Sequence, residues 1–364
     1  MNSLFEFLKD RRIQFTKVLS LLVSRRRTTS TRYRRILFLR RDGIGDAVMF
    51  MPAFRAIKQK FPLAQIDLVN FKGPDTVLSA ESEVNVIESV FLHFCRCFLK
   101  GHQYDCAVVF SGGRELPILK FFQRYRNITV VSNTLRDPGE HYTGFYFRLC
   151  EMAFGKLTRS KPAPYLTVTA PEKAAARNTL LQNDLVNHRK IGIIVGSIAW
   201  WKRYSNWQGL LDHIKADPEL KDCKVCLLGG PTAKTQANTL CAKYQDIINF
   251  THLSLRQAMA LACELDLLLC VDSGFMHVAN ALGTKTLALF GPTEPLNLIG
   301  NNGHNRILAA TLQPECSPCY DPHKNFSCKR DSKCMEFPAD RLLTIAKQII
   351  AGEKDFKEPV VVLN

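Results

Sequence analysis

The chain has 364 residues, of which 46% are hydrophobic and 23% are charged, and its formal net charge is +16. This length suits two domains of about 150 residues, each large enough to enclose a sizeable core. No apolar run approaches the roughly 18 residues that a membrane-spanning helix needs, and none is followed by a small-residue cleavage site. We therefore expect neither an integral membrane protein nor a secreted precursor, and we expect a cytoplasmic protein.

Half of the net charge lies in the first tenth of the chain. Residues 1–35 hold ten Lys and Arg against Glu6 and Asp10, a net +8. Apolar side chains repeat there at helical spacing, at Leu4, Leu8, Phe15, Leu19 and Leu22. A basic amphipathic helix is typical of attachment to an anionic membrane surface, so we predict that role for residues 1–34, with a solvated tail as the alternative. No RNP, zinc-finger or helix-turn-helix pattern accompanies the charge, and we expect no nucleic-acid partner.

The chain contains thirteen cysteines, a number that could suggest a secreted disulfide scaffold, but their placement argues against one. Nine of them are scattered through apolar segments such as "DCAVVF" and "KVCLLGG". A thiol in such a segment behaves as a small core residue. We therefore predict that these nine are reduced and buried.

From residue 35 onward, short β-rich runs alternate with amphipathic helical stretches, which is typical of crossover units on a parallel sheet. Strand-like runs occur at 35–40, 65–71, 104–110, 127–132, 190–197, 224–230, 266–274 and 285–291, and helical patterns at 47–61, 116–125, 206–214, 233–244, 255–265 and 277–283. A segment with three prolines, residues 158–174, interrupts the alternation. The pattern predicts an α/β protein with two doubly wound, Rossmann-like domains that face a central cleft and are joined near this segment.

In such domains ligands bind beyond the carboxyl ends of the strands, so the turns that follow strands are the places to look for chemistry. The first turn, "RRDGIGDAVMF", lacks the third glycine of a dinucleotide fingerprint. Gly43 and Gly45 allow a tight turn, and Asp46 falls in the first helical turn, where a carboxylate stays ionised and can accept a proton. The alternative is structural: Asp42 caps the helix and Asp46 complements its dipole.

Two later turns carry further polar residues. In "VDSGFMHVANALGTKTLALFGPTEP", Asp272 ends an apolar strand, Ser273 and Gly274 open a helix with free amides, and His277 follows one turn later. In "VGSIAWWKRYSNW", Gly196 and Ser197 lead into a loop that carries Lys202 and Arg203 among aromatic residues. Such a loop can bring a cation to a diphosphate, although a lone Lys-Arg pair is more often a solvated surface feature.

These stretches together resemble one enzyme family. "FLRRDGIGDAVMFMPAFRAIKQKFP", "GSIAWWKRYSNW", "LSLRQAMALACELDLLLCVDSGFMHVANALGTKTLALFGPTEP" and "CSPC" are similar to the ADP-heptose:lipopolysaccharide heptosyltransferases, over roughly residues 34–350 and in the same order. The resemblance implies a GT-B fold, with an acceptor-binding domain at 35–165, a nucleotide-sugar domain at 166–350 and a C-terminal tail at 351–364. It implies inverting transfer of heptose from ADP-heptose to a lipid-linked lipopolysaccharide core acceptor at the cytoplasmic membrane face.

The same resemblance assigns roles to the residues of the turns. Asp46 matches the proposed general base, with Asp42, Gly43 and Gly45 in its turn, and Lys202 matches the basic residue that contacts the donor diphosphate. The implied donor-binding residues are Gly196, Ser197, Lys202, Arg203, Asp272, Ser273, Gly274 and His277. Many members carry an acid after the "GGP" turn, whereas this chain reads "GGPTAKTQ". Another nucleotide sugar, or a binding protein without catalysis, therefore stays open as an alternative.

One remaining motif raises the question of a metal. "CSPCYDPHKNFSCKRDSKC" places Cys316 and Cys319 at CxxC spacing, followed by Cys328 and Cys334. Four thiols are compatible with a structural zinc, but the second pair is separated by five residues instead of two. The resemblance implies no obligatory metal or other cofactor for transfer. We therefore expect a reduced loop, and zinc at these four cysteines is the alternative.

Overall fold

The structure is a computed structural model that describes residues 33–40, 42–71, 75–89, 104–110, 128–131, 136–137, 139–158, 163–299, 305–320, 328 and 330–363. The chain divides into two compact units, residues 1–164 and 165–364, and each is described here by itself. The predicted membrane-binding segment 1–34 lies almost wholly outside the described residues, as does the helix predicted at 116–125. Among the helices that the structure describes, none has the length and apolar composition needed to cross a membrane.

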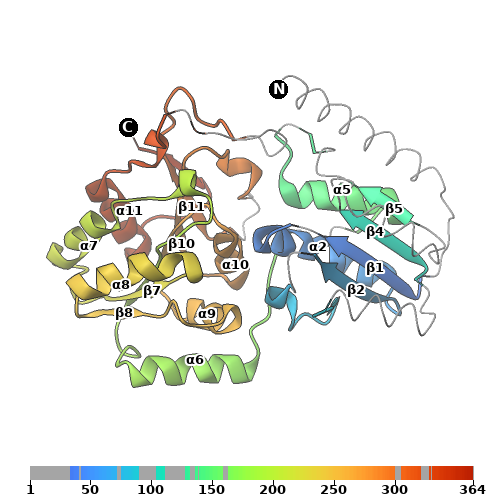
Figure 1. The fold of residues 1–364 in the computed structure, drawn as a ribbon, viewed down its shortest axis with the longest axis horizontal. Helices are drawn as coiled ribbons and strands as arrows, with labels where there is room; N and C mark the ends of the chain where they lie inside the picture. Colours follow the sequence, from blue (N-terminus) through green and yellow to red (C-terminus); the bar gives the residue numbers. More distant parts are fainter. Residues whose placement is uncertain are drawn as a thin grey trace. The chain divides into compact units, whose positions relative to one another are not determined.

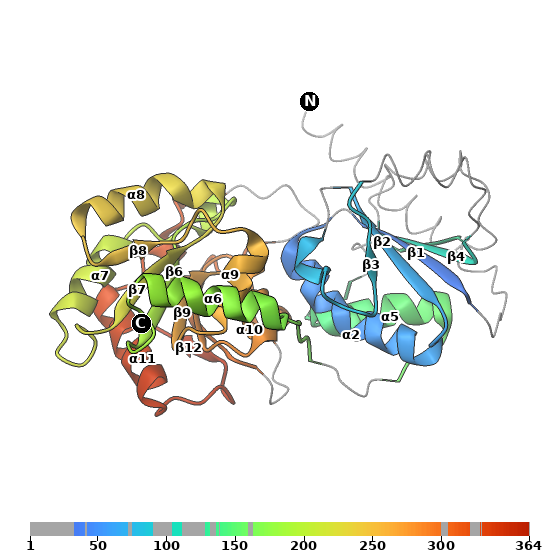
Figure 2. The same ribbon diagram turned by 90° about the horizontal axis from the view of Figure 1, so that it is seen from below.

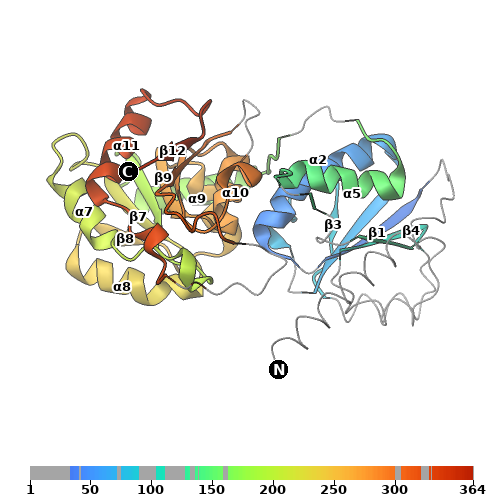
Figure 3. The same cartoon turned by 90° about the horizontal axis from the view of Figure 1, so that it is seen from above.

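The first unit is built on a parallel sheet of five strands in the order β3-β2-β1-β4-β5. The strands are β1 (Arg35–Arg40), β2 (Gln65–Asn70), β3 (Asn85–Val86), β4 (Cys106–Phe110) and β5 (Ile128–Val131), and the helices are α2 (Ile44–Lys60), η1 (Thr76–Leu78) and α5 (Tyr142–Phe154). Helices α2 and α5 lie side by side along the sheet (Figures 1 and 3). Rings of Phe38 on β1 and Phe50 and Phe54 on α2 pack edge to face between helix and sheet. The predicted crossover pattern is confirmed for these elements.

The second unit holds a parallel sheet of seven strands in the order β12-β11-β10-β9-β6-β7-β8. Its strands are β6 (Lys190–Ile194), β7 (Lys224–Leu228), β8 (Ile247–Asn249), β9 (Leu267–Val271), β10 (Thr286–Phe290), β11 (Ile307–Thr311) and β12 (Val360–Val362). Its helices are α6 (Ala170–Gln182), η3 (Trp200–Lys202), α7 (Trp207–Ala216), η4 (Pro231–Ala233), α8 (Lys234–Lys243), α9 (Leu255–Ala262), α10 (Gly274–Leu282), η5 (Pro295–Asn297), η6 (Lys333–Met335) and α11 (Ala339–Ala351).

Helices cover both faces of this second sheet, which gives three layers (Figures 1 and 2). Leu210 of α7, Leu240 of α8 and Leu342 of α11 belong to the core on one face. Leu180 of α6 and Met276 of α10 belong to the core on the other face, together with residues of α9. Because both faces are covered, the central strands β9 and β10 are buried along their whole length and consist of apolar residues except for Thr286, instead of alternating, as the runs in the sequence predict.

Two predictions about the second unit are wrong in detail. Residues 351–364 are not merely a tail, because β12 pairs in parallel with β11, with Ala309 opposite Val360, as an edge strand of the sheet. Among the described members of the nine scattered cysteines, all are free and most are buried, but Cys263 is exposed and Cys241 is partly exposed. Cys241 lies on α8 and Cys263 directly follows α9. A cysteine in an apolar segment of the sequence can still face solvent at such a position.

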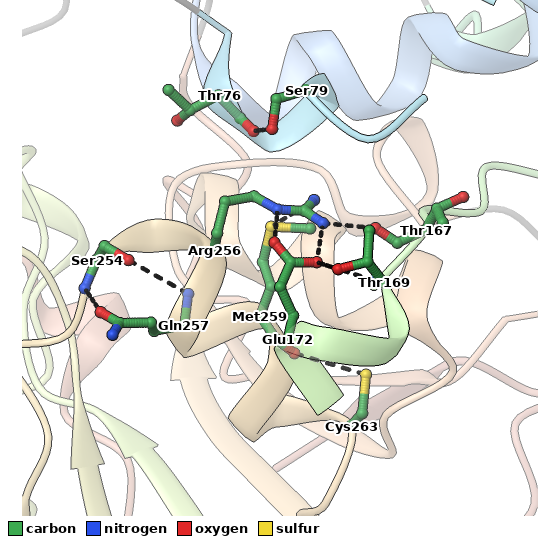
Figure 4. Close-up of polar contacts among 10 residues, drawn as sticks. All are labelled: Thr76, Ser79, Thr167, Thr169, Glu172, Ser254, Arg256, Gln257, Met259 and Cys263. Carbon is green, nitrogen blue, oxygen red and sulfur yellow. Dashed lines mark hydrogen bonds and ion pairs between the residues drawn. The ribbon is translucent and has the colours of Figure 1, made fainter. Parts of the chain in front are cut away.

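The beginning of the second unit is held by a polar cluster on α6 and α9 (Figure 4). Thr169 and Glu172 form a capping box at the start of α6, and the Thr169 amide donates to the Glu172 carboxylate at 2.8 Å. Arg256 of α9 donates to both oxygens of Glu172, at 2.7 and 2.5 Å, and to the Thr167 carbonyl at 2.8 Å. These bonds hold the Glu172 pKa down at about 2, chiefly because the Arg256 guanidinium stabilises the ionised carboxylate. The cluster therefore attaches α6 to α9 where the chain enters the unit.

Candidate active site

The predicted acceptor-side turn connects β1 to α2 in the first unit. Gly43 is the N-cap of α2, in an extended conformation, so Asp42 does not cap the helix as the structural alternative proposes. The Asp46 carboxylate lies in the first helical turn and accepts a hydrogen bond from the Gly43 amide at 3.1 Å, as the acid of a capping box does. The structural alternative gives Asp46 only the role of complementing the helix dipole, whereas the capping box also fixes its carboxylate at the carboxyl end of β1.

A second donor reaches Asp46 from a distant part of the chain. The Tyr146 hydroxyl on α5 donates to Asp46 Oδ1 at 2.8 Å, while the Gly43 amide occupies Oδ2. Tyr146 is fully buried and contacts the ring of Phe50 at 4.8 Å between centroids. Burial, with the negative charges of Asp46 and Asp42, raises the Tyr146 pKa well above its ordinary value, so the hydroxyl remains a donor.

A buried arginine pairs with two of the carboxylates around the turn. Arg40 is fully buried at the end of β1, forms a short ion pair with Asp42, and lies 3.6 Å from Asp75. Asn70 of β2 donates to Asp75 at 3.0 Å and to the Asp42 carbonyl at 3.3 Å. Burial raises the Asp42 pKa to about 6, and the nearby Asp46 and Asp75 charges act in the same direction against the lowering effect of Arg40. The turn is therefore an ordered network of carboxylates around one guanidinium.

Sequence reasoning found Asp42, Gly43, Gly45 and Asp46 but missed most of the partners of this turn. The strand-like run 35–40 ends at Arg40, but nothing in that run indicates that its guanidinium is buried. The remaining partners that it missed come from segments with no motif of their own: Asn70, Asp75 and Tyr146. Their places depend on the pairing of β1 with β2 and on the packing of α5 against α2, which local pattern does not reveal.

In the second unit, the loop after β6 carries the predicted cations. Gly196 lies against Ala233, where an added Cβ would come to 3.1 Å from the Ala233 backbone, so the close approach favours glycine. Ser197 is buried, and its carbonyl accepts a hydrogen bond from Arg203 Nε at 2.9 Å. Arg203 is an exposed residue, but this hydrogen bond from its guanidinium ties the loop together. Lys202 ends the short helix η3, and its ammonium turns toward the strand β9.

Lys202 and Asp272, which the sequence places 70 residues apart, form an ion pair. Lys202 Nζ lies 2.5 Å from Asp272 Oδ2, and the Thr293 hydroxyl donates to the same oxygen at 2.5 Å. Asp272 and Thr293 are both buried. Burial alone would raise the Asp272 pKa, but the Lys202 charge, the bonds from Lys202 and Thr293, and His277 outweigh it and lower the pKa below its usual value. The structure thus rejects the solvated-surface alternative for Lys202.

The start of α10 supplies backbone amides next to this pair. Ser273 is the N-cap in an extended conformation, Gly274 begins the helix, and His277 is buried one turn later. The Ser273 hydroxyl is buried and has no hydrogen-bond partner among the described residues. A buried polar atom without a partner is costly unless a ligand satisfies it. The helix start therefore has the features of an anion site beside a lysine.

The "GPT" turn that carries Thr293 is covered by the cysteine-containing segment. The Ser317 hydroxyl donates to the Gly291 carbonyl at 2.6 Å, and the amides of Cys319 and Tyr320 donate to the Pro292 carbonyl at 2.9 and 2.8 Å. Tyr320 places its ring 5.2 Å from the Lys202 ammonium. The segment thus supports the turn and contributes an aromatic face to Lys202.

The four cysteines of that segment differ in exposure. Cys319 is exposed, Cys316 and Cys328 are partly exposed, and Cys334 is buried, with its pKa raised to about 11 by burial and by the neighbouring thiols. Within the described part of the chain, no three His, Cys, Asp or Glu side chains form a group that could hold a metal ion. The zinc alternative therefore gains no support from the described residues.

Two Rossmann-like units, with a carboxylate at the first turn of one and a Lys-Asp pair beside a helix start in the other, have the features expected of a glycosyltransferase of the GT-B class. Residues 118–329 match the model of glycosyltransferase family 9 (heptosyltransferase), and the chain belongs to this family. The matched region contains the whole Lys202–Asp272 site, whereas Asp46 precedes it.

Curated relatives and solved structures agree with this assignment. The chain is 25% identical over 296 residues to lipooligosaccharide heptosyltransferase 2 of Haemophilus ducreyi, with 72% of this chain and 84% of the relative covered. It is 24% identical over 339 residues to lipopolysaccharide heptosyltransferase 1 of Pseudomonas aeruginosa, with coverage of 82% and 92%.

Among solved structures, a family 9 glycosyltransferase from Veillonella parvula superposes with a TM-score of 0.74 at 17% identity, covering 89% of this chain and 99% of that one. ADP-heptose lipopolysaccharide heptosyltransferase II of E. coli superposes with a TM-score of 0.66 at 19% identity, covering 88% and all of the respective chains. The predicted GT-B fold is confirmed.

Proposed function

We propose that this glycosyltransferase transfers heptose from ADP-heptose, with inversion, to a lipopolysaccharide core acceptor. The observation that carries the proposal is the Lys202–Asp272 pair at the start of α10, in the region that matches the family. A curated relative is named a lipopolysaccharide heptosyltransferase and a solved neighbour an ADP-heptose heptosyltransferase, which supports the choice of donor and acceptor.

The proposed donor site lies in the second unit, around the start of α10. Lys202 and the amides at Ser273 and Gly274 supply positive charge to the leaving diphosphate, whose negative charge grows as the glycosidic bond breaks. A bound diphosphate competes with Asp272 for the lysine, and Thr293 continues to donate to Asp272 when Lys202 turns toward the phosphates. Gly196, Ser197, Arg203 and His277 complete the proposed surroundings of the donor.

The proposed acceptor site lies at the turn between β1 and α2. Asp46 takes the proton of the attacking hydroxyl as the new bond to the anomeric carbon forms and the bond to the diphosphate breaks. One displacement inverts the anomeric centre and needs no nucleophile from the enzyme. The Gly43 amide, which donates to Asp46 Oδ2, keeps this carboxylate at the carboxyl end of β1, where the acceptor is proposed to bind.

One observation keeps a second donor under consideration. The "GGPTAKTQ" turn presents Thr232 and Lys234 to solvent and buries Ala233 against Gly196, so it offers no carboxylate at the position where many family members have one. A transferase with another nucleotide sugar is therefore the alternative proposal. A catalytically inactive binding protein is not favoured, because Asp46, Lys202 and Asp272 are all present and hydrogen-bonded.

The test is a panel of nucleotide sugars with heptose-deficient lipid acceptors and product detection by mass spectrometry. We expect a mass increase of one heptose with ADP-heptose and not with UDP- or GDP-hexoses. Transfer from another nucleotide sugar at a higher rate would support the alternative. No transfer from any donor, with ADP still bound, would favour a binding protein.

We further propose that the enzyme works at the inner face of the cytoplasmic membrane, where its lipid-linked acceptor would lie. The support is the net charge of +8 in residues 1–35. Attraction of basic residues to anionic lipids contributes about 1 kcal/mol per residue near the surface.

A further inference from the structure

The feature that the proposed mechanism leaves unused is the hydroxyl of Tyr146. It belongs to the second turn of α5, which follows α2 by many residues, yet it donates to Asp46 Oδ1 at 2.8 Å. The other oxygen, Oδ2, accepts the Gly43 amide at 3.1 Å. Each oxygen of the Asp46 carboxylate thus accepts a hydrogen bond, and the two donors come from separate elements. Together they fix the rotation of the carboxylate about its side-chain bond and the plane of its oxygens.

The hydroxyl is itself held firmly in place. The Tyr146 ring is fully buried, with its centroid 4.8 Å from the ring of Phe50 and 5.5 Å from that of Phe145. Phe50 is on α2, the same helix that carries Asp46, so the ring contact and the hydrogen bond join α5 to α2 at one point. Because the pKa of this phenol is raised well above its ordinary value, the hydroxyl donates at every working pH.

The surroundings of Asp46 explain why such a donor is useful. Asp42 lies in the same turn as Asp46, and both Asp42 and Asp75 lie against the Arg40 guanidinium. The only cation that the described residues place in this network is Arg40, which pairs with Asp42 and Asp75 and not with Asp46. Asp46 is therefore held by hydrogen bonds from the Tyr146 hydroxyl and the Gly43 amide, and a carboxylate oxygen that accepts one bond can still accept a second from a substrate hydroxyl.

We infer that Tyr146 is a positioning residue for the base Asp46, an inference that rests on the proposed function. It holds Asp46 Oδ1 in the orientation that receives the acceptor proton and leaves donor binding to the other unit. Loss of the hydroxyl frees the carboxylate to rotate away from the attacking hydroxyl. Misplacement of a reacting group by about 1 Å costs as much as a hundredfold in rate.

The test compares Tyr146→Phe with a matched control, Tyr104→Phe. The Tyr104 hydroxyl also donates to a buried carboxylate of the first unit, Asp67 Oδ2 at 2.6 Å, but at the starting ends of the strands. Phenylalanine keeps every carbon contact in both variants. We expect both to lower the melting temperature to a similar extent, while only Tyr146→Phe lowers kcat, by about ten- to a hundredfold, with the KM of both substrates within about twofold of the wild type.

A double-mutant cycle with Asp46→Asn separates positioning from a general structural effect. If Tyr146 acts through Asp46, adding Tyr146→Phe to Asp46→Asn leaves the residual rate unchanged. An equal loss in both backgrounds, or an unchanged kcat in folded Tyr146→Phe, overturns the inference and leaves the proposed function standing. A wild-type enzyme that transfers no sugar from any donor overturns the proposed function, and the inference with it.

Discussion

Asp46 is the residue on which the proposed acceptor chemistry depends. We expect Asp46→Asn to lower kcat by about a hundredfold to ten-thousandfold, because the amide fills the same space but cannot take a proton. ADP affinity should stay within a few-fold of the wild type, since the proposed donor site is in the other unit. Rates from single-turnover transfer assays and calorimetry with ADP check both expectations.

The matched control for this change is Asp105→Asn. Asp105 accepts the backbone amides of Arg34 and Arg35 at 2.7 and 3.0 Å, at the starting edge of the same sheet. Both variants lose a carboxylate that accepts backbone bonds, so both should be somewhat less stable. Normal turnover of Asp46→Asn, or equal losses of rate in the two variants, would remove Asp46 from the mechanism.

We expect the loss of the Lys202 side chain to affect both ADP binding and the stability of the second unit. Lys202→Ala should weaken ADP binding and lower turnover, because the cation acts on the diphosphate before and during its departure. It also leaves Asp272 buried without its ion-pair partner, which destabilises the second unit. Calorimetry well below the melting temperature separates the two effects. The exposed Lys221→Ala is the control, and unchanged ADP affinity in Lys202→Ala would argue against a role in the donor site.

Among the elements, the junction of α6 and α9 gives a prediction that depends on pH. Glu172→Gln should lower the free energy of unfolding at pH 7 by about 1 to 2 kcal/mol, because the Arg256 fork loses its charged acceptor. The folded-state pKa of Glu172 is about 2, below its ordinary value of 4.5. Its contribution is therefore complete above pH 4.5 and is lost as the pH falls toward 2.

Urea denaturation of wild type and Glu172→Gln at several pH values measures this difference. The two free energies should converge as the pH drops from 5 toward 2. Glu264→Gln, at an exposed position just after α9, is the control and should have little effect at any pH. A difference that stays constant with pH would show that the Arg256 pair is not its source.

The segment with Cys316, Cys319, Cys328 and Cys334 gives a prediction about the metal content and the thiol reactivity of the purified protein. Because the second cysteine pair is separated by five residues instead of the two of a common zinc site, we expect the purified protein to contain little zinc and to have reactive thiols at Cys316, Cys319 and Cys328. The buried Cys334 should react more slowly, because its raised pKa keeps it protonated. About one equivalent of metal per chain, lost on chelation with loosening of residues 314–336, would instead establish the zinc alternative.

The elements were predictable to the extent that they are local. Apolar runs and helical periodicity located β1, β6, β9 and α10 correctly, because the residues of each of these elements show by their own pattern which side chains are buried. The contacts of the site were not predictable in the same way. Lys202 meets Asp272, and Tyr146 meets Asp46, only after the sheet order and helix packing are fixed. Edge strand β12 was missed because three valines beside a sheet resemble a short apolar tail.

For the molecule as a whole, the basic N-terminal segment should determine membrane attachment. Removal of residues 2–31 should abolish sedimentation with anionic vesicles at low salt, while activity on a soluble truncated acceptor is kept. The deletion should spare Tyr33, which is buried with its ring 5.0 Å from Phe61 and 5.5 Å from Phe154. Vesicles of neutral lipid and high salt are the controls. Equal sedimentation of the shortened and full chains would place membrane contact elsewhere.

The all-parallel pairing of both sheets has a consequence for how quickly the chain can fold. Ile36 of β1 pairs with Cys106 of β4, and Ile191 of β6 pairs with Leu267 of β9. Each central strand therefore pairs with a strand that lies about 70 residues later in the chain and is synthesised after it. Folding rates fall as the mean sequence separation of contacts rises, because loop closure must precede the contacts that stabilise it. During synthesis, β1 and β6 therefore expose apolar edges before their partners arrive, and refolding from urea should be slow and prone to aggregation at high protein concentration.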